Sequence, residues 1–298
     1  MKLLVFGSLN LDTVLQVDHF VSAGETLQAL EVQVYPGGKG LNQAIAVARA
    51  GGTVHMAGTV GQDGRLLLDL MAENNVHHEL VHKTDGLTGA AYIQVDRTGQ
   101  NCIVIAGNAN TRNTEDRIRE VLAHFNAGDL LLLQNEINLL DELIRQASNK
   151  GMRIYLNPSP FNAAIMASPL ERISGFILNE VEGFQMTGET EPARILDMLL
   201  SRYPDADLIL TLGPRGAIFK NREMTIHQKC YEGEPVDTTA AGDTFTGYYL
   251  ASLQSGSDQA TAMRLASKAA AIAVTIPGAT SSIPRLADVL RSPIVEMP

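Results

Sequence analysis

The residues with the clearest chemical potential lie in segment 236–248, where small side chains precede an acidic one. An apolar helical pattern begins at Phe245, two residues after Asp243. Small residues at a helix N-terminus let backbone N–H groups approach a bound anion, which the helix dipole also favours. Asp243 is placed to accept a proton from a substrate hydroxyl. The combination suits phosphoryl transfer to an alcohol; the alternative is that Asp243 simply caps the helix.

A glycine-rich stretch, PGGKGLNQA at 36–44, precedes another expected helix. Its glycines permit positive φ angles and close approach of the backbone to a ligand. The stretch matches neither a Walker A loop nor a GxGxxG turn after a first strand. Taken alone, it is either a structural turn or a binding loop.

Together, these two stretches carry a family resemblance. Residues 237–245, DTTAAGDTF, resemble the C-terminal signature of the ribokinase (PfkB) family of carbohydrate kinases, and residues 36–44 resemble its N-terminal signature. The two occur in the expected order, and the resemblance covers essentially the whole chain. It implies an ATP-dependent kinase that phosphorylates a primary hydroxyl of a small sugar, with ribose expected first. The alternatives are a family kinase for deoxyribose, a ketohexose or a nucleoside, or a non-catalytic sugar- or nucleotide-binding regulator.

The resemblance also implies roles for individual residues. Asp243 would be the base, and the N–H groups of Ala240, Ala241, Gly242 and Asp243 would form an anion hole. Leu41 stands where the family commonly has alanine, so it either narrows the sugar pocket or points into the core. The alternative for Asn10 and Asp12 is an Asx-turn pair in a loop. The implied sugar contacts are Asn10, Asp12, Gly38, Lys39, Gly40, Leu41, Asn42, Glu136 and Asp243.

Two cation sites are implied as well. Asn179 and Glu182 match the family's Asn-x-x-Glu, in which the glutamate holds Mg²⁺ through water; alone, such a pair is an ordinary acidic helix start. The implied ligands of a monovalent cation, K⁺ in the family, are Asp237, Thr239, Ala273, Ile276, Gly278 and Ser282. The implied nucleotide contacts are Asn179, Thr211, Gly213, Arg215, Gly216, Gly242 and Ser267.

Composition narrows the class of protein. A net charge of −10 argues against nucleic acid as a partner. No apolar run approaches the roughly 20 residues of a membrane-spanning helix, and two cysteines in 298 residues indicate a reducing cytoplasm. Gly7-Ser8-Leu9-Asn10 lacks the glycine spacing of a dinucleotide-binding turn, which disfavours a dehydrogenase. His77, His78 and His82 are expected in a solvated turn without metal.

The expected elements would position these residues at one edge of a sheet. Strands alternate with helices along most of the chain, which predicts a mostly parallel sheet with helices on both faces. Asn10, Glu136, Asn179 and Thr211 follow or end expected strands, where ligands of such sheets bind. We therefore expect one ribokinase-like three-layer α/β/α domain over 1–298. A small β lid within 14–34 and 89–107 would cover the ligand and, by the resemblance, join two subunits in a homodimer.

Overall fold

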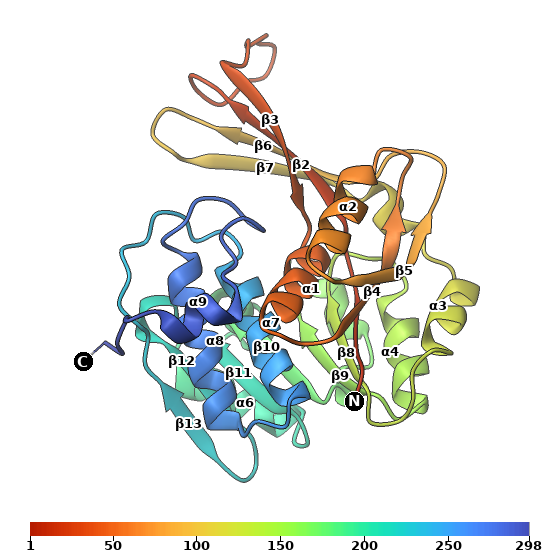
Figure 1. Ribbon diagram of the computed structural model, residues 1–298, viewed down its shortest axis with the longest axis vertical. Coiled ribbons are helices and arrows are strands. Elements are labelled where there is room, and N and C mark those ends of the chain that lie inside the picture. Colours follow the sequence, from red (N-terminus) through yellow and green to blue (C-terminus); the bar gives the residue numbers. More distant parts are fainter. Residues whose placement is uncertain (298) are drawn as a thin grey trace.

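The computed structural model describes residues 1–297, which form a large layered body and a small sheet projecting from it (Figure 1). Seven neighbouring strands of the large sheet are parallel to one another, and the last two strands of the chain are added antiparallel at one edge. In spatial order the nine strands are β13 (Thr225–Gln228), β12 (Ala217–Lys220), β11 (Asp207–Thr211), β10 (Gly175–Asn179), β9 (Arg153–Asn157), β8 (Leu130–Gln134), β1 (Leu3–Phe6), β4 (Val54–Val60) and β5 (His77–Lys83).

Helices cover both faces of this sheet because its central strands are apolar on both sides. In β1, Leu3 and Val5 face one core, while Leu4 and Phe6 face the other. The first core packs against α1 (Lys39–Arg49), α2 (Arg65–Glu73), α7 (Ala241–Gln254), α8 (Gln259–Ala273) and α9 (Leu286–Arg291). The second packs against α3 (Glu115–Leu122), α4 (Leu140–Asn149), α5 (Glu180–Thr187) and α6 (Pro192–Arg202).

The smaller sheet, which we call the lid, consists of four strands that extend away from the body in Figure 1. β2 pairs parallel with β6 and antiparallel with β3, and β6 forms a hairpin with β7. The strands are, in spatial order, β3 (Glu31–Gly37), β2 (Asn10–Gln16), β6 (Gly89–Val95) and β7 (Asn101–Ala106). Because only three residues separate the end of β1 from the start of β2, the lid is tied directly to the edge where β1 finishes.

The three-layer fold is confirmed, with local differences. β2 begins at Asn10 and β3 ends at Gly37, so the lid strands reach beyond 14–34 into the body. The expected solvated turn at His77, His78 and His82 is wrong: these residues lie in β5, the edge strand of the large sheet. A strand at the edge of a sheet can carry polar residues on its exposed side. In β5 this obscures the alternation of apolar and polar residues by which a strand is recognised in a sequence.

Two further expectations concern the whole chain. Among residues 1–297, no helix combines the length and apolar character needed to cross a bilayer. Cys102 and Cys230 are both free thiols, and Cys102 is exposed.

Candidate active site

Asp243 lies in the first turn of α7, and its side chain is only 6% exposed. The residue before the helix, the N-cap Ala240, is a non-glycine residue in the left-handed conformation with φ 60°. A Cβ atom added to Gly242 would have no atom of the described chain within 4 Å, so space is open beside this first turn. A buried carboxylate therefore adjoins an accessible helix N-terminus, as the motif predicts.

Two side-chain amides from α1 hold this carboxylate. Asn42 Nδ2 donates to Asp243 Oδ2 at 3.0 Å, and Gln43 Nε2 donates to Asp243 Oδ1 at 2.8 Å. The helices approach closely because Gly247 of α7 lies against Ala46 of α1, where a Cβ would come within 2.3 Å of the alanine methyl carbon. Helix packing thus delivers the amides to the carboxylate, whose oxygens remain hydrogen-bond acceptors.

A further buried amide fixes the orientation of Gln43. Gln134, at the end of β8, donates from Nε2 to Gln43 Oε1 at 2.6 Å. Gln43 must then turn its NH₂ group toward Asp243, and this group also lies 3.2 Å from Asn157 Oδ1 at the end of β9. Both glutamines are completely buried. The chain of amides leaves Asp243 a single compatible role, that of acceptor.

Lys39 supplies positive charge to the same site. The Asp243 carboxylate, followed by Glu136 and Glu182, raises the pKa of Lys39 above its ordinary value, although burial opposes the shift. The ammonium group therefore stays protonated among three carboxylates. In a chain with a net charge of −10, this local cation is one means of attracting an anion.

The residues expected to bind sugar converge from the lid and the body. Asn10, in β2, accepts a hydrogen bond from Asn110 Nδ2 at 2.7 Å, while Ser8 Oγ donates to Glu136 Oε2. Burial, and then the nearby Glu136, raises the pKa of Asp12 to about 6. Within residues 1–297, Asp12 Oδ1 and Asn42 Oδ1 are buried without a hydrogen-bond partner. Such orphaned acceptors are suited to the hydroxyl groups of a ligand.

A cavity of about 290 Å³ opens beside Asn10 and Glu136, whereas Asp12, Asn42 and Asp243 do not line it. Asn10 and Glu136 line it together with Asn110, and Ile105 of β7 contributes an apolar wall from the lid. The volume is appropriate for a small polar molecule.

The glycines of the 36–44 stretch line a tight turn, whereas the side chain of Leu41 packs in the core. Gly38 caps α1 with φ 93°, and a Cβ there would lie 2.9 Å from the Ser8 carbonyl oxygen, so the turn requires glycine. Gly40 is equally close to Ser8. Leu41 is completely buried in the core, so its side chain does not narrow the cavity. This settles the alternative in favour of a packing role for that side chain.

The residues expected to bind nucleotide and Mg²⁺ lie at the ends of β10 and β11, where Asn179 pairs with Thr211. Asn179 and Glu182 form a capping box at the start of α5: Asn179 Oδ1 accepts from Glu182 N at 2.9 Å, and Glu182 Oε2 accepts from Asn179 N at 3.0 Å. The ordinary helix-start role is thus present. Glu182 nevertheless keeps a buried carboxylate near Lys39, and carboxylate oxygen with retained water is what Mg²⁺ prefers.

The remaining nucleotide candidates lie on separate elements. Gly213 and Arg215 bound a short 3-10 turn after β11, and Arg215 forms an ion pair with Glu180. Gly216 has φ 89° and closes that turn. Ser267 is buried in α8.

The two loops expected to hold a monovalent cation are in contact. Asp237 Oδ1 accepts from Thr239 N and Oδ2 accepts from Gly278 N, both at 2.8 Å. Burial raises the pKa of Asp237, but these hydrogen bonds outweigh it and keep the pKa below its ordinary value. Within residues 1–297, the carbonyl oxygens of Thr239, Ile276 and Gly278 accept no hydrogen bond, which suits a hard cation. The other two candidates are already engaged: Ala273 O accepts a hydrogen bond from Ile276 N, and Ser282 Oγ donates one to Ala279 O.

Comparison with known proteins identifies the family. A model described as pfkB family carbohydrate kinase matches residues 1–286. The chain belongs to the PfkB family of carbohydrate kinases. This PfkB kinase is 35% identical to the ribokinase of Haemophilus influenzae, over 97% of both chains. Its fold resembles the ribokinase of Thermotoga maritima (31% identity, TM-score 0.84, 97% and 98% of the two chains). It also resembles the Arabidopsis thaliana ribokinase solved with ribose and ATP (28%, TM-score 0.86, 97% of each chain).

Sequence reasoning about this PfkB kinase missed four polar residues of the site. Gln134 and Asn157 end strands β8 and β9, so the rule that ligands gather at carboxyl ends of parallel strands could have found them. Gln43 lies inside the quoted glycine-rich motif beside Asn42. Asn110 lies in a short 3-10 turn and gives no local signal.

We predict that Gln43→Met, which keeps the side-chain length but removes the amide, lowers kcat about tenfold or more. The variant loses a hydrogen bond to a charged group, worth about 1.5–3 kcal/mol, and frees the Asp243 carboxylate to rotate. KM for the sugar should change little, because Gln43 does not line the cavity. Steady-state kinetics checks this, with circular dichroism to verify folding; a kcat equal to wild type would contradict it.

Proposed function

We propose that this protein is an ATP-dependent ribokinase, which transfers the γ-phosphate of ATP to the primary hydroxyl of ribose and yields ribose 5-phosphate. The observation that carries the proposal is the buried Asp243 carboxylate, oriented by Asn42 and Gln43 at an open helix N-terminus beside protonated Lys39. Ribokinases among its relatives, including one solved with ribose and ATP, support the choice of substrates.

In this mechanism the sugar lies between the lid and the body. Asn10, Asp12 and Glu136 bind its hydroxyls, and the primary hydroxyl faces Asp243. Its oxygen forms a bond to the γ-phosphorus, the bond from that phosphorus to the β,γ-bridging oxygen breaks, and the hydroxyl proton passes to Asp243. Backbone N–H groups of residues 240–243 stabilise the charge that develops on the transferred group, an effect worth about 3 kcal/mol per donor in other enzymes; of these, Ala241 N must first leave the Thr238 carbonyl oxygen, to which it donates at 3.2 Å. The lid excludes water and so limits hydrolysis of ATP.

Cations complete the proposed site. Glu182 would hold Mg²⁺ through water, and the ion would supply neutralisation of the nucleotide phosphates. Asp237 and the carbonyls of the 273–278 loop would hold K⁺, which fixes the segment that leads into the anion hole. We also place the protein in the cytoplasm, which its free thiols support.

The lid further supports a homodimer. Residues paired across the four strands share one face, so the row Val34, Thr13, Tyr92 and Val104 lies opposite Asp12. Val34, Tyr92 and Val104 are 52%, 44% and 62% exposed, an apolar surface that needs a cover. We propose that the same face of a second subunit provides it, in a two-fold symmetric contact.

The function is tested by coupled ADP release from ATP and Mg²⁺ with ribose, deoxyribose, a ketohexose and a nucleoside, in K⁺ and then in Na⁺. We expect the highest kcat/KM with ribose and a higher rate in K⁺. Turnover with another acceptor alone would replace ribose as the substrate. Bound ATP without turnover on any acceptor would overturn the kinase proposal and favour a regulator.

Acidic pH should weaken the use of ribose. Since burial raises the pKa of Asp12 to about 6, this side chain becomes protonated below that pH and loses an acceptor for sugar hydroxyls. We expect kcat/KM for ribose to fall below pH about 6, and Asp12→Asn to lower kcat/KM while flattening that limb. Burial also raises the pKa of Glu136. The pH profile of Glu136→Gln is therefore compared with that of Asp12→Asn, to distinguish which of the two carboxyl groups produces the acidic limb. An unchanged limb in Asp12→Asn would contradict the assignment.

For the dimer, Val104→Glu should produce monomers, because it places a charge within the proposed apolar contact. Leu290→Glu, at an equally exposed position on α9, is the matched control and should leave the mass unchanged. Light scattering after size-exclusion chromatography measures both. A wild-type monomer, or a dimer that survives Val104→Glu, would refute this interface.

A further inference from the structure

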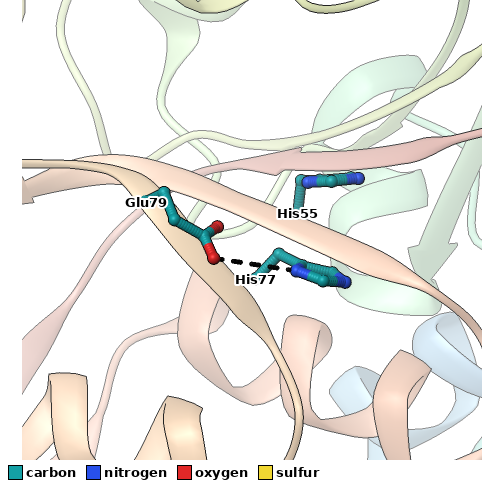
Figure 2. Close-up of side chains that lie close together, drawn as sticks. All are labelled: His55, His77 and Glu79. Carbon is teal, nitrogen blue, oxygen red and sulfur yellow. Dashed lines mark ion pairs between the residues drawn. The ribbon is translucent and has the colours of Figure 1, made fainter.

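Three potential metal ligands meet on the large sheet, away from the proposed active site. His55 of β4 and His77 and Glu79 of β5 place one ligand atom each within 4.8 Å of one another (Figure 2). His55 is the second residue of β4, so the group lies toward the amino ends of the strands. The residues proposed for catalysis gather instead where β8, β9, β10 and β11 end.

Strand pairing explains why these side chains are adjacent. His55 lies directly opposite His77 in the parallel pair of β4 and β5, and their rings stack with centroids 4.8 Å apart. The register then shifts, so that Ala57 lies opposite Leu80 and β5 carries one additional residue at this point. Glu79 lies within this bulge with Oε1 3.8 Å from His77 Nδ1. A backbone irregularity thus brings the carboxylate beside the two imidazoles, as bulges often re-aim side chains.

The donor set selects a class of ion. Two imidazoles and one carboxylate suit Zn²⁺ and its first-row neighbours, whereas Mg²⁺ prefers oxygen ligands alone. Burial, followed by His77 and Lys2, lowers the pKa of His55.

The surroundings allow the ligands to close on an ion. His55 is held against the edge of the Phe125 ring at a centroid distance of 5.6 Å, while His77 and Glu79 have 49% and 73% of their side chains exposed. A tetrahedral zinc site with bonds of about 2.0 Å needs donor atoms roughly 3.3 Å apart. The His55 and His77 rings are stacked at an interplanar angle of 22°, so the exposed His77 ring must turn, and the exposed Glu79 must follow, to bring the donor atoms onto one ion. The nearby Lys2 ammonium is engaged by the His124 carbonyl oxygen at 3.0 Å.

We propose that His55, His77 and Glu79 bind a divalent transition-metal ion of the zinc class, with water in the remaining position. The ion joins the edge strand β5 to β4 on the exposed rim of the sheet. Its role is to fasten the start of β5, and it is independent of the phosphoryl-transfer site.

Isothermal titration with Zn²⁺ tests the proposal, in the presence of millimolar Mg²⁺ to occupy sites built from carboxylates. We expect one zinc site per wild-type chain, and an affinity at least tenfold lower in His55→Gln and in His77→Gln. Glu79→Gln should lower it several-fold. His82→Gln, on the same strand but outside the group, is the matched control and should bind as wild type does. Co²⁺ bound to the wild type should show the visible absorption of a four-coordinate ion, lost in His77→Gln.

Two results would overturn the proposal: a wild type that takes up no more Zn²⁺ than His77→Gln, or a loss in His82→Gln equal to that in His77→Gln. His77 is exposed, so His77→Gln keeps the test valid even if His55→Gln disturbs packing against Phe125. Sugar-dependent ADP release with Mg²⁺ should be unchanged in His77→Gln, which verifies that this variant is folded.

Discussion

The structure depends on keeping one buried carboxylate charged. Asp243 is withdrawn from water, and an isolated charge there would cost several kcal/mol. Two amide donors and the Lys39 ammonium compensate, while the first turn of α7 adds its dipole. None of these groups is near Asp243 in the sequence apart from the helix itself. The packing of α1 on α7, made close by Gly247, is therefore a requirement of the chemistry as well as of the core.

The point at which the lid joins the body also matters for the proposed site. Asn10 and Asp12 belong to β2, which leaves the body almost immediately after β1. Side chains proposed to bind sugar are thus carried on the lid, whereas Asp243, Lys39 and Asn42 are carried on helices of the body. A sugar held by both parts would draw them together, so substrate binding and exclusion of water become one event.

Much of this was predictable from sequence because the important residues lie in short, chemically unusual stretches. DTTAAGDTF and PGGKGLNQA predicted the anion site and its partner loop, and the alternation of strands and helices predicted the three layers. Contacts between amides distant in the sequence were not predictable: Gln43, Gln134 and Asn157 are ordinary polar residues until the sheet places them together. The side chain of Leu41 was ambiguous for the same reason, since only packing decides whether it faces a cavity or the core. β5 was missed because its polar edge and its bulge obscure the period of two.

The most direct test of the central claim compares Asp243→Asn with wild type in two measurements, kcat for ribose phosphorylation and ribose binding by calorimetry. If Asp243 is the base, kcat should fall by about 10²–10⁴-fold, while ribose affinity changes much less. Asp258→Asn, which alters an exposed helix-capping aspartate, should behave as wild type. Turnover near the wild-type rate in a folded Asp243→Asn enzyme would contradict the account, because the buried carboxylate would then have no catalytic role.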